Sequence, residues 1–279
     1  MRRGKRGSFF AVACLIAGLS PGGSAAMSGL DEQAALRTSQ AAIGRQIGPY
    51  TLTDSHGSPV DLRSLGGRPA LVSFIYTSCA HTCPIITQRL AAAVNEARDV
   101  LGEGRFSVLT IGFDAPTDSP ERMRDYALQR HMDTRDWYFL SGDPDTMRRL
   151  TAEFGFVYIP APHGYDHLAQ VSVLDGSGRL QSQIYGDDFP PAAVVEPLRQ
   201  LLLGSTGTLA GSIGILDRIR LFCTVYDPAS GRYGFDYSLL LVVMTGIMSL
   251  GGILYFIITN WRQSARKGES IGAPKGLPR

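Results

Sequence analysis

Apolar and polar positions divide the chain into a central stretch of alternating strand and helix signals and two uninterrupted apolar runs near the ends. Leu71–Tyr76 is a continuous apolar segment with β-branched and aromatic members, which is typical of a strand buried on both faces of a sheet. Similar apolar segments predict four further strands: Phe106–Phe113, Trp137–Leu140, Val171–Leu174 and Leu180–Tyr185.

Helix signals lie between these strands. Apolar residues at helical spacing predict one helix over Pro84–Leu101 and another over Ala192–Leu203. Ser119-Pro120 and Asp143-Pro144 each place a capping side chain before a proline, which predicts two more helix starts, and Gly155 ends the second of these helices. The alternation of strands and helices predicts an α/β fold built in layers.

The first apolar run, Phe9–Leu19, is about half as long as a bilayer span requires. It follows a cationic stretch and precedes small residues, so residues 1–26 are predicted to be a signal peptide cleaved near Ala26. An uncleaved N-terminal anchor is the alternative. Cys14 lies inside the run and is interpreted as part of its removed core, with a lipoprotein acceptor as the second reading.

The second apolar run, Ser238–Thr259, has 22 residues and no charge, which is long enough to span a bilayer. A basic tail over residues 260–279 follows it directly. The positive-inside rule then predicts a single-pass protein of the inner (cytoplasmic) membrane. Its tail lies in the cytoplasm and its body lies on the periplasmic or other extracytoplasmic side.

The two runs frame three further segments. Residues 27–46 are polar and weakly patterned, and we expect a flexible lead or a short helix there. Residues 47–203 hold the α/β domain. Residues 204–237 form a linker and juxtamembrane extension, too short to have a core of its own.

Composition limits the range of functions. The chain has 279 residues, 44% of them hydrophobic and 19% charged, with a net charge of +2, which excludes a wholly disordered protein. The basic residues gather at both ends, so the body between them is net acidic. Because nucleic-acid binding needs a basic surface, no nucleic acid is expected as a partner. The basic ends favour a lipid bilayer.

Cys79 and Cys83 carry the strongest chemical signal, because they lie four residues apart where a buried strand passes into a helix. On a helix this spacing places both residues on one face, with their Cα atoms roughly 6 Å apart, within reach of a disulfide. A helix N-terminus also favours the thiolate form. The pair is predicted to cycle between dithiol and disulfide or to bind a soft metal, and a purely structural disulfide is the alternative.

Four ordered motifs resemble the Sco/SenC family, thioredoxin-fold copper proteins that help to assemble cytochrome c oxidase. The resemblance covers roughly residues 45–203. Its motifs are Phe74–Cys79 with Cys83-Pro84, the Gly112–Glu121 loop and helix start, Trp137–Gly142, and Asp166-His167.

The resemblance implies a thioredoxin-like three-layer α/β fold followed by one C-terminal transmembrane helix. It also implies that Cys79, Cys83 and His167 bind copper, as Cu(I) or Cu(II). Thiolates prefer Cu(I), and imidazole accepts both oxidation states. Zinc would accept the same ligands.

The function implied is that of a membrane-tethered copper metallochaperone for the binuclear copper site of cytochrome c oxidase. Its partners would be the copper-bearing subunit of the oxidase, and a copper donor or thiol reductant outside the cytoplasmic membrane. One alternative is a thiol-disulfide oxidoreductase that reduces the cysteines of that copper site, with Cys79 and Cys83 as the redox-active pair. A thiol peroxidase is a weaker alternative.

Other histidines and one cysteine leave the ligand set open. His163 is the closest rival of His167, and His81, between the two cysteines, either offers a nitrogen ligand or is a solvated loop residue. His56 and His131 are interpreted as structural or solvated. Cys223 is either a buried thiol near the membrane or an accessory thiol. Its surroundings resemble a branch of the family with a C-terminal extension.

Overall fold

The computed structural model describes residues 29–62, 67–79, 82–132, 135–162, 164–204, 224–227, 232–235 and 238–269. The predicted signal peptide lies outside the described residues, and so do four side chains considered above: Cys14, His81, His163 and Cys223.

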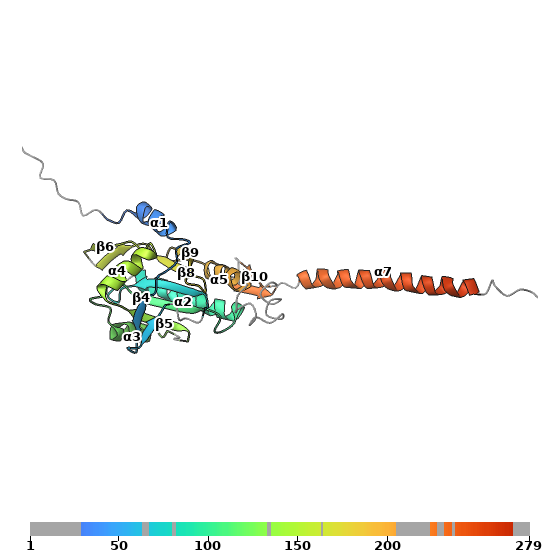
Figure 1. Cartoon of the computed structure of the whole chain (residues 1–279), viewed down its shortest axis with the longest axis horizontal. Coiled ribbons are helices and arrows are strands. Elements are labelled where there is room, and N and C mark those ends of the chain that lie inside the picture. Colours follow the sequence, from blue (N-terminus) through green and yellow to red (C-terminus); the bar gives the residue numbers. More distant parts are fainter. Residues whose placement is uncertain are drawn as a thin grey trace, which may run out of the picture.

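Seven of the described strands form one mixed sheet at the centre of the body (Figure 1). The three in its middle, β5, β4 and β3, run parallel, and every other neighbouring pair is antiparallel. In spatial order the strands are β2 (Pro59–Asp61), β1 (Thr51–Asp54), β5 (Trp137–Ser141), β4 (Ser107–Gly112), β3 (Ala70–Ile75), β8 (Gln170–Leu174) and β9 (Leu180–Tyr185).

All six residues of β3 and all six of β4 are buried, because helices cover both faces of this sheet. The crossovers from β3 to β4 and from β4 to β5 run in the same direction across the sheet, and right-handed connections therefore place their helices on one face. These helices are α2 (Thr82–Leu101) and α3 (Pro120–Gln129), and α5 (Ala192–Gly204) packs against α2.

The other face carries α4 (Pro144–Glu153). Phe154, which caps α4, meets Phe74 of β3 edge to face, with ring centroids 5.3 Å apart. The predicted three-layer arrangement is therefore confirmed. Ser119 and Asp143 cap α3 and α4 as expected, each followed by proline at the helix start.

Residues 27–46, for which a flexible lead or a short helix was expected, contain the helix α1 (Glu32–Gln40). Asp31 caps it by accepting a 2.9 Å hydrogen bond from the Ala34 amide. The Ser39 hydroxyl is buried and donates to the Gln170 side chain at 2.7 Å. This contact ties α1 to β8, so the helix is part of the folded body.

A second, two-stranded sheet was not predicted. It consists of β6 (Tyr158–Ala161) and β7 (Gly164–His167), paired antiparallel. Its strands are mostly half-buried and short, and they lack the continuous apolar run that marks β3.

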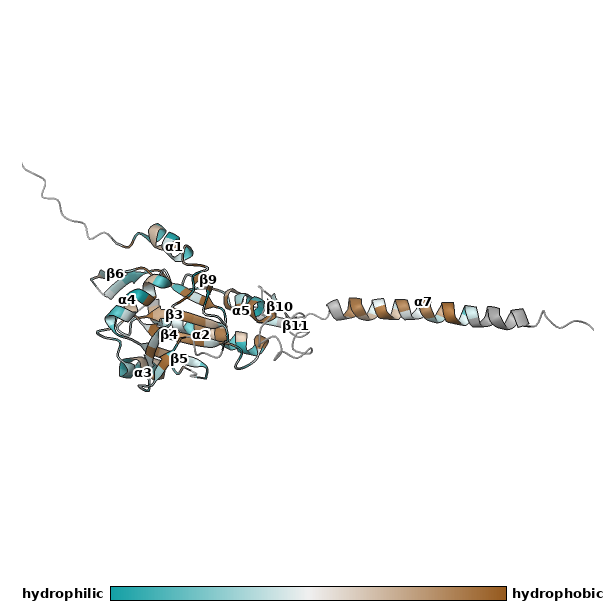
Figure 2. Cartoon of the chain, viewed as in Figure 1, coloured by the Kyte–Doolittle hydropathy of each residue, from teal (hydrophilic) through white to brown (hydrophobic). Residues whose placement is uncertain are grey.

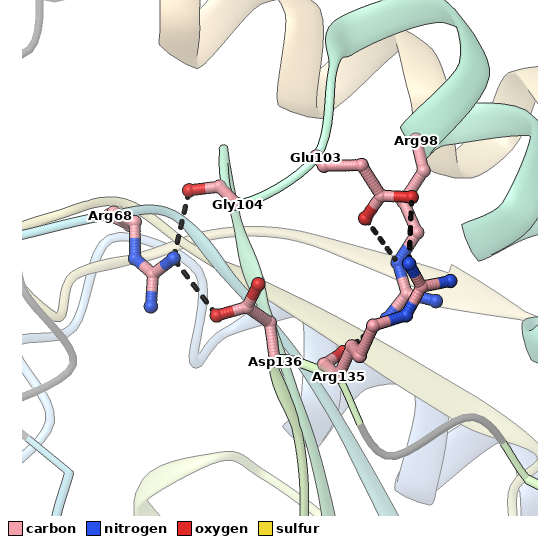
Figure 3. Close-up of polar contacts among 6 residues, drawn as sticks. All are labelled: Arg68, Arg98, Glu103, Gly104, Arg135 and Asp136. Carbon is pink, nitrogen blue, oxygen red and sulfur yellow. Dashed lines mark hydrogen bonds and ion pairs between the residues drawn. The ribbon is translucent and has the colours of Figure 1, made fainter.

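Polar contacts tie together the ends at which the parallel strands begin (Figure 3). Arg68, before β3, donates to the Gly104 carbonyl, before β4, at 2.8 Å and to Asp136, before β5, at 3.0 Å. Parallel strands all begin at the same edge of the sheet, so these contacts stabilise that edge. The cysteine pair follows the other end of β3, at the opposite edge.

Beyond the body, the described residues include a hairpin of β10 (Thr224–Asp227) and β11 (Arg232–Phe235) and the long helix α7 (Ser238–Glu269). Within α7, Leu241–Trp261 is long and apolar enough to cross a membrane, with a mean hydropathy of 2.2 and none of it buried. Figures 1 and 2 show this apolar helix extending away from the body, on the side where the hairpin lies.

Candidate functional site

The two cysteines lie at the junction between β3 and α2. The Cys79 amide donates to the Tyr76 carbonyl at 3.1 Å, which turns the chain after the strand. Cys83 lies in the first turn of α2, and its amide donates to the Cys79 sulfur at 3.3 Å. The two cysteines form no disulfide, and their side chains are hydrogen-bonded to each other, so the pair that the spacing predicts is present.

The two thiols differ in access. Cys83 is completely buried and Cys79 is 8% exposed. A hydrogen bond with Cys79 and burial raise the pKa of the Cys83 thiol. Both causes oppose the thiolate form of Cys83, which the position at the helix N-terminus was expected to favour.

His167 ends β7, and its orientation is set by its neighbour in the chain. Its Nδ1 lies 2.9 Å from the Leu168 carbonyl oxygen. A carbonyl can only accept, so Nδ1 carries the proton in the neutral ring and Nε2 keeps its lone pair for a metal. The ring packs against Phe156 and Phe113, with centroids 5.4 and 5.7 Å away.

Cys79 and His167 line the same pocket, of about 410 Å³. Tyr76, Tyr165 and Asp166 also line it, and Gly29, Leu30 and Glu32 form the wall next to α1. Cys83 does not line this pocket and lies behind Cys79. The structure therefore brings the three predicted ligands into one region from two separate elements, the β3–α2 junction and the end of β7.

The three side chains do not form a ready-made cage. Within the described part of the chain, no three His, Cys, Asp or Glu side chains lie close enough together to hold a metal ion. Binding one ion through all three residues therefore requires the β6–β7 hairpin or the thiol loop to shift.

Asp118 supports the loop that leads to the cysteines, a role that the sequence did not indicate. It is 1% exposed, and its Oδ1 accepts from the amide and the hydroxyl of Thr77 at 2.8 and 2.7 Å. Its Oδ2 accepts from the Asp114 amide at 2.9 Å. Gly112 has no room for a side chain, because a Cβ there would lie 2.5 Å from the Asp118 Cβ.

Tyr76 joins the thiol loop to the histidine hairpin. Burial and a hydrogen bond with Cys79 raise the pKa of its phenol to about 12, so it stays protonated near neutral pH. Its ring lies 6.1 Å from the His167 ring, and its atoms approach within 2.7 Å of the position that a Cβ on Gly164 would take. The glycine thus allows β7 to come close to the tyrosine.

Neither His56 nor His131 lines this pocket. His56 follows β1 in the turn to β2, where its Nδ1 is 3.4 Å from the Ser55 hydroxyl. His131 follows the end of α3 with a φ of 50°. Their positions in a turn and after a helix end agree with the interpretation of both as structural or solvated residues.

Comparison with known families decides the relationship. A family model described as SCO1/SenC matches residues 38–203, more than half of the chain. The chain belongs to the SCO1/SenC family. The match contains the cysteine pair, Asp118 and His167, and it ends before the hairpin and α7.

Relatives and solved structures agree with this assignment. The SCO1 protein homolog of Bacillus subtilis (strain 168) is 29% identical over 155 residues, which are 53% of this chain and 78% of that protein. Arabidopsis thaliana ScoI, solved with copper bound, shares the fold with a TM-score of 0.51 at 18% identity, covering 58% of this chain and all of that one.

BsSco, described as a Sco-family cytochrome c oxidase assembly protein with a disulfide switch, also has the same fold. Its TM-score is 0.51 at 18% identity, covering 57% of this chain and 94% of that one. The likeness in these structures lies in the α/β body, and the thioredoxin-like fold that the motifs predicted is confirmed.

Proposed function

We propose that this protein is a membrane-tethered copper metallochaperone for the binuclear copper site of cytochrome c oxidase, and that it holds copper through Cys79, Cys83 and His167. The observation that carries the proposal is the state of His167. Its Nδ1 is hydrogen-bonded to the Leu168 carbonyl, which leaves the lone pair of Nε2 for a metal, and His167 lines the same pocket as Cys79.

The donor set fits copper in both oxidation states. Two thiolates suit Cu(I), and the imidazole nitrogen is also a good ligand for Cu(II), so one site can carry either ion. The copper-bound Arabidopsis relative and the oxidase-assembly description of BsSco support this cargo and this partner. An oxidised Cys79–Cys83 pair offers no thiolates, so the redox state of the pair controls loading.

The apolar part of α7 is the membrane anchor. The basic residues after it favour a cytoplasmic tail and a body on the other side of the membrane, where we expect the copper-bearing oxidase subunit and a copper donor or thiol reductant. Protease added from the body's side of the membrane should cut the body and spare the tail. Cleavage of the tail under those conditions would reverse the orientation.

Copper titration of the reduced protein tests the ligand set. We expect one copper per chain in the wild type, and no tight copper after Cys79→Ser or Cys83→Ser, because one thiolate and one imidazole leave a soft ion under-coordinated. His167→Ala should weaken Cu(II) binding strongly. His56→Ala is the matched control and should bind as the wild type does. Tight, stoichiometric copper in a Cys79→Ser/Cys83→Ser double variant would overturn the assignment.

A thiol-disulfide oxidoreductase is the second candidate, and the direct contact between two thiols that form no disulfide and differ in exposure favours it. In such an enzyme Cys79, which lines the pocket, would attack a substrate disulfide, and Cys83 would then release the product by forming the Cys79–Cys83 disulfide.

His167→Ala separates the two candidates, because dithiol chemistry does not need the imidazole. If copper carriage is the essential function, this variant keeps disulfide reduction within a few-fold but loses oxidase maturation. Maturation that survives in His167→Ala and is lost in Cys79→Ser would favour the oxidoreductase.

A further inference from the structure

The hairpin of β10 and β11 lies after the family match and directly before α7. Four residue pairs hold it together, from Thr224 with Phe235 to Asp227 with Arg232. Neither the copper site nor the membrane anchor requires this segment.

Tyr233 fastens the hairpin to the body by two hydrogen bonds to two different helices. Its amide donates to Glu96 Oε1 of α2 at 2.8 Å, and its hydroxyl donates to Glu196 Oε1 of α5 at 3.0 Å. Arg199 holds the other oxygen of Glu196 at 2.6 Å. The Tyr233 ring is half-buried against the core and lies 5.2 Å from the ring of Tyr226.

The position of this contact along α2 determines which end of the body lies near the anchor. Glu96 is thirteen residues after Cys83 on the same helix, which at 1.5 Å per residue is about 20 Å. From Phe235, only three residue steps lead to Ser238, a distance of at most about 11 Å. Figure 1 shows α7 leaving the body beside β10, whereas β6, the partner of the histidine strand, lies at the other end of the body.

We propose that the hairpin is a docking element that holds the body in one orientation on its anchor, with the Cys79–His167 pocket turned away from the bilayer. The partner that fits this geometry is a membrane protein whose copper-accepting domain extends above the bilayer and faces the end of α2 that carries Cys83. This inference rests on the proposed function for the identity of the partner, but the orientation itself is a property of the chain.

Energy transfer in lipid nanodiscs tests the orientation on the full chain. A donor dye is attached through a non-natural side chain at Ile85 or at Asp99, two exposed positions near opposite ends of α2, and the acceptor is carried by lipid headgroups. We expect clearly stronger transfer from position 99 than from position 85. Equal transfer, or stronger transfer from position 85, would overturn the proposal.

Release of the hairpin should abolish this difference. The variant Glu96→Ala/Tyr233→Ala removes both hydrogen bonds, and Glu96→Gln is the control because it keeps an acceptor oxygen for the Tyr233 amide. We expect the two donor positions to give similar transfer in the double variant and to keep their difference in the control. A difference that persists in the double variant would contradict docking through Tyr233.

The same variants test the consequence in cells. The double variant should bind one copper per chain like the wild type but mature the oxidase several-fold less well, and a flexible spacer inserted between Phe235 and Ser238 should act in the same way. Full maturation in both would overturn the functional part of the proposal. Cys79→Ser separates the two questions. It should lose copper carriage and oxidase maturation, while its energy-transfer pattern stays that of the wild type.

Discussion

Replacing Asp118 by Asn should loosen the loop that presents the cysteines, although Asp118 touches neither sulfur in any described contact. Its carboxylate accepts three hydrogen bonds from a completely enclosed position, two from Thr77 and one from Asp114. Asn keeps one oxygen for the Thr77 donors. It turns an NH₂ group toward the Asp114 amide, so that two donors face each other where a donor faced an acceptor.

The cost follows from the number and kind of bonds lost. A hydrogen bond to a charged acceptor contributes about 1.5–3 kcal/mol, and an unpaired buried donor costs about 1–3 kcal/mol. Losing one bond and weakening two others should lower the free energy of unfolding by about 3 kcal/mol. For a body of this size that corresponds to a melting temperature lower by about 6–12 °C.

The assay is thermal and urea unfolding of the reduced body, truncated after Gly204, where α5 ends and one residue beyond the family match. The control is Glu121→Gln, the same chemical change in the adjacent, exposed first turn of α3, which we expect to change the stability little because the group stays in water. Copper affinity should fall only in Asp118→Asn. Equal stability of the two variants would refute the view that Asp118 holds the loop.

The same variant has a pH signature. Burial raises the pKa of Asp118 more than its three hydrogen bonds lower it, so the folded protein holds this proton more tightly than the unfolded chain does. The stability gained from the group is therefore complete below the unfolded pKa of about 4 and declines as the pH rises through the folded value. The stability difference between wild type and Asp118→Asn should be larger at pH 4 than at pH 7.

Two further predictions concern glycine packing and thiol access. Gly155→Ala should lower the free energy of unfolding by well over about 1 kcal/mol, because its φ is +64° and a Cβ would lie 2.7 Å from the Thr38 carbonyl oxygen. Gly57 also has a positive φ but has open space around it, so Gly57→Ala should lower the free energy of unfolding only by the roughly 1 kcal/mol of backbone strain that it introduces. Iodoacetamide should modify Cys79 before Cys83, because Cys79 lines the pocket and Cys83 is buried with a raised pKa. Peptide mass mapping after partial alkylation measures the order, and preferential labelling of Cys83 would contradict it.

The elements that carry the fold could be predicted because their signals are local. Leu71–Tyr76 is apolar throughout since β3 is covered on both faces, and Ser119 and Asp143 use capping chemistry that depends on only a few neighbouring residues. Proline at the first helical position fixes the start of both helices. These features need no knowledge of the rest of the chain.

The elements that complete the site were either left open, as the helix α1 was, or not predicted, as β6 and β7 were, because their stability comes from distant partners. The helix α1 is polar, and its buried contact is Ser39 with Gln170, 131 residues away in the chain. The strands β6 and β7 are held by each other and by the aromatic rings around Phe113. A pattern of hydrophobic positions carries no trace of such contacts.

The chemistry of the site could likewise be predicted only where it depends on local sequence or on the family motifs. The Cys79–Cys83 pair followed from spacing, and His167 from the family resemblance. The raised pKa of the Cys83 thiol depends on its hydrogen bond with Cys79 and on its burial, and neither can be read from the sequence. The role of Asp118 likewise depends on the absence of a side chain at Gly112, which leaves room for its carboxylate beneath the thiol loop.

The pocket is therefore a property of the closed fold and not of any one motif. Its walls come from the segment before α1, from the β3–α2 junction and from β7, and Tyr76 and Gly164 bring the last two together. A variant that only loosens one wall should lose copper affinity in proportion to its loss of stability. A variant that removes a proposed ligand, such as Cys79→Ser, should lose copper binding at almost full stability, and this contrast distinguishes ligands from the residues that position them.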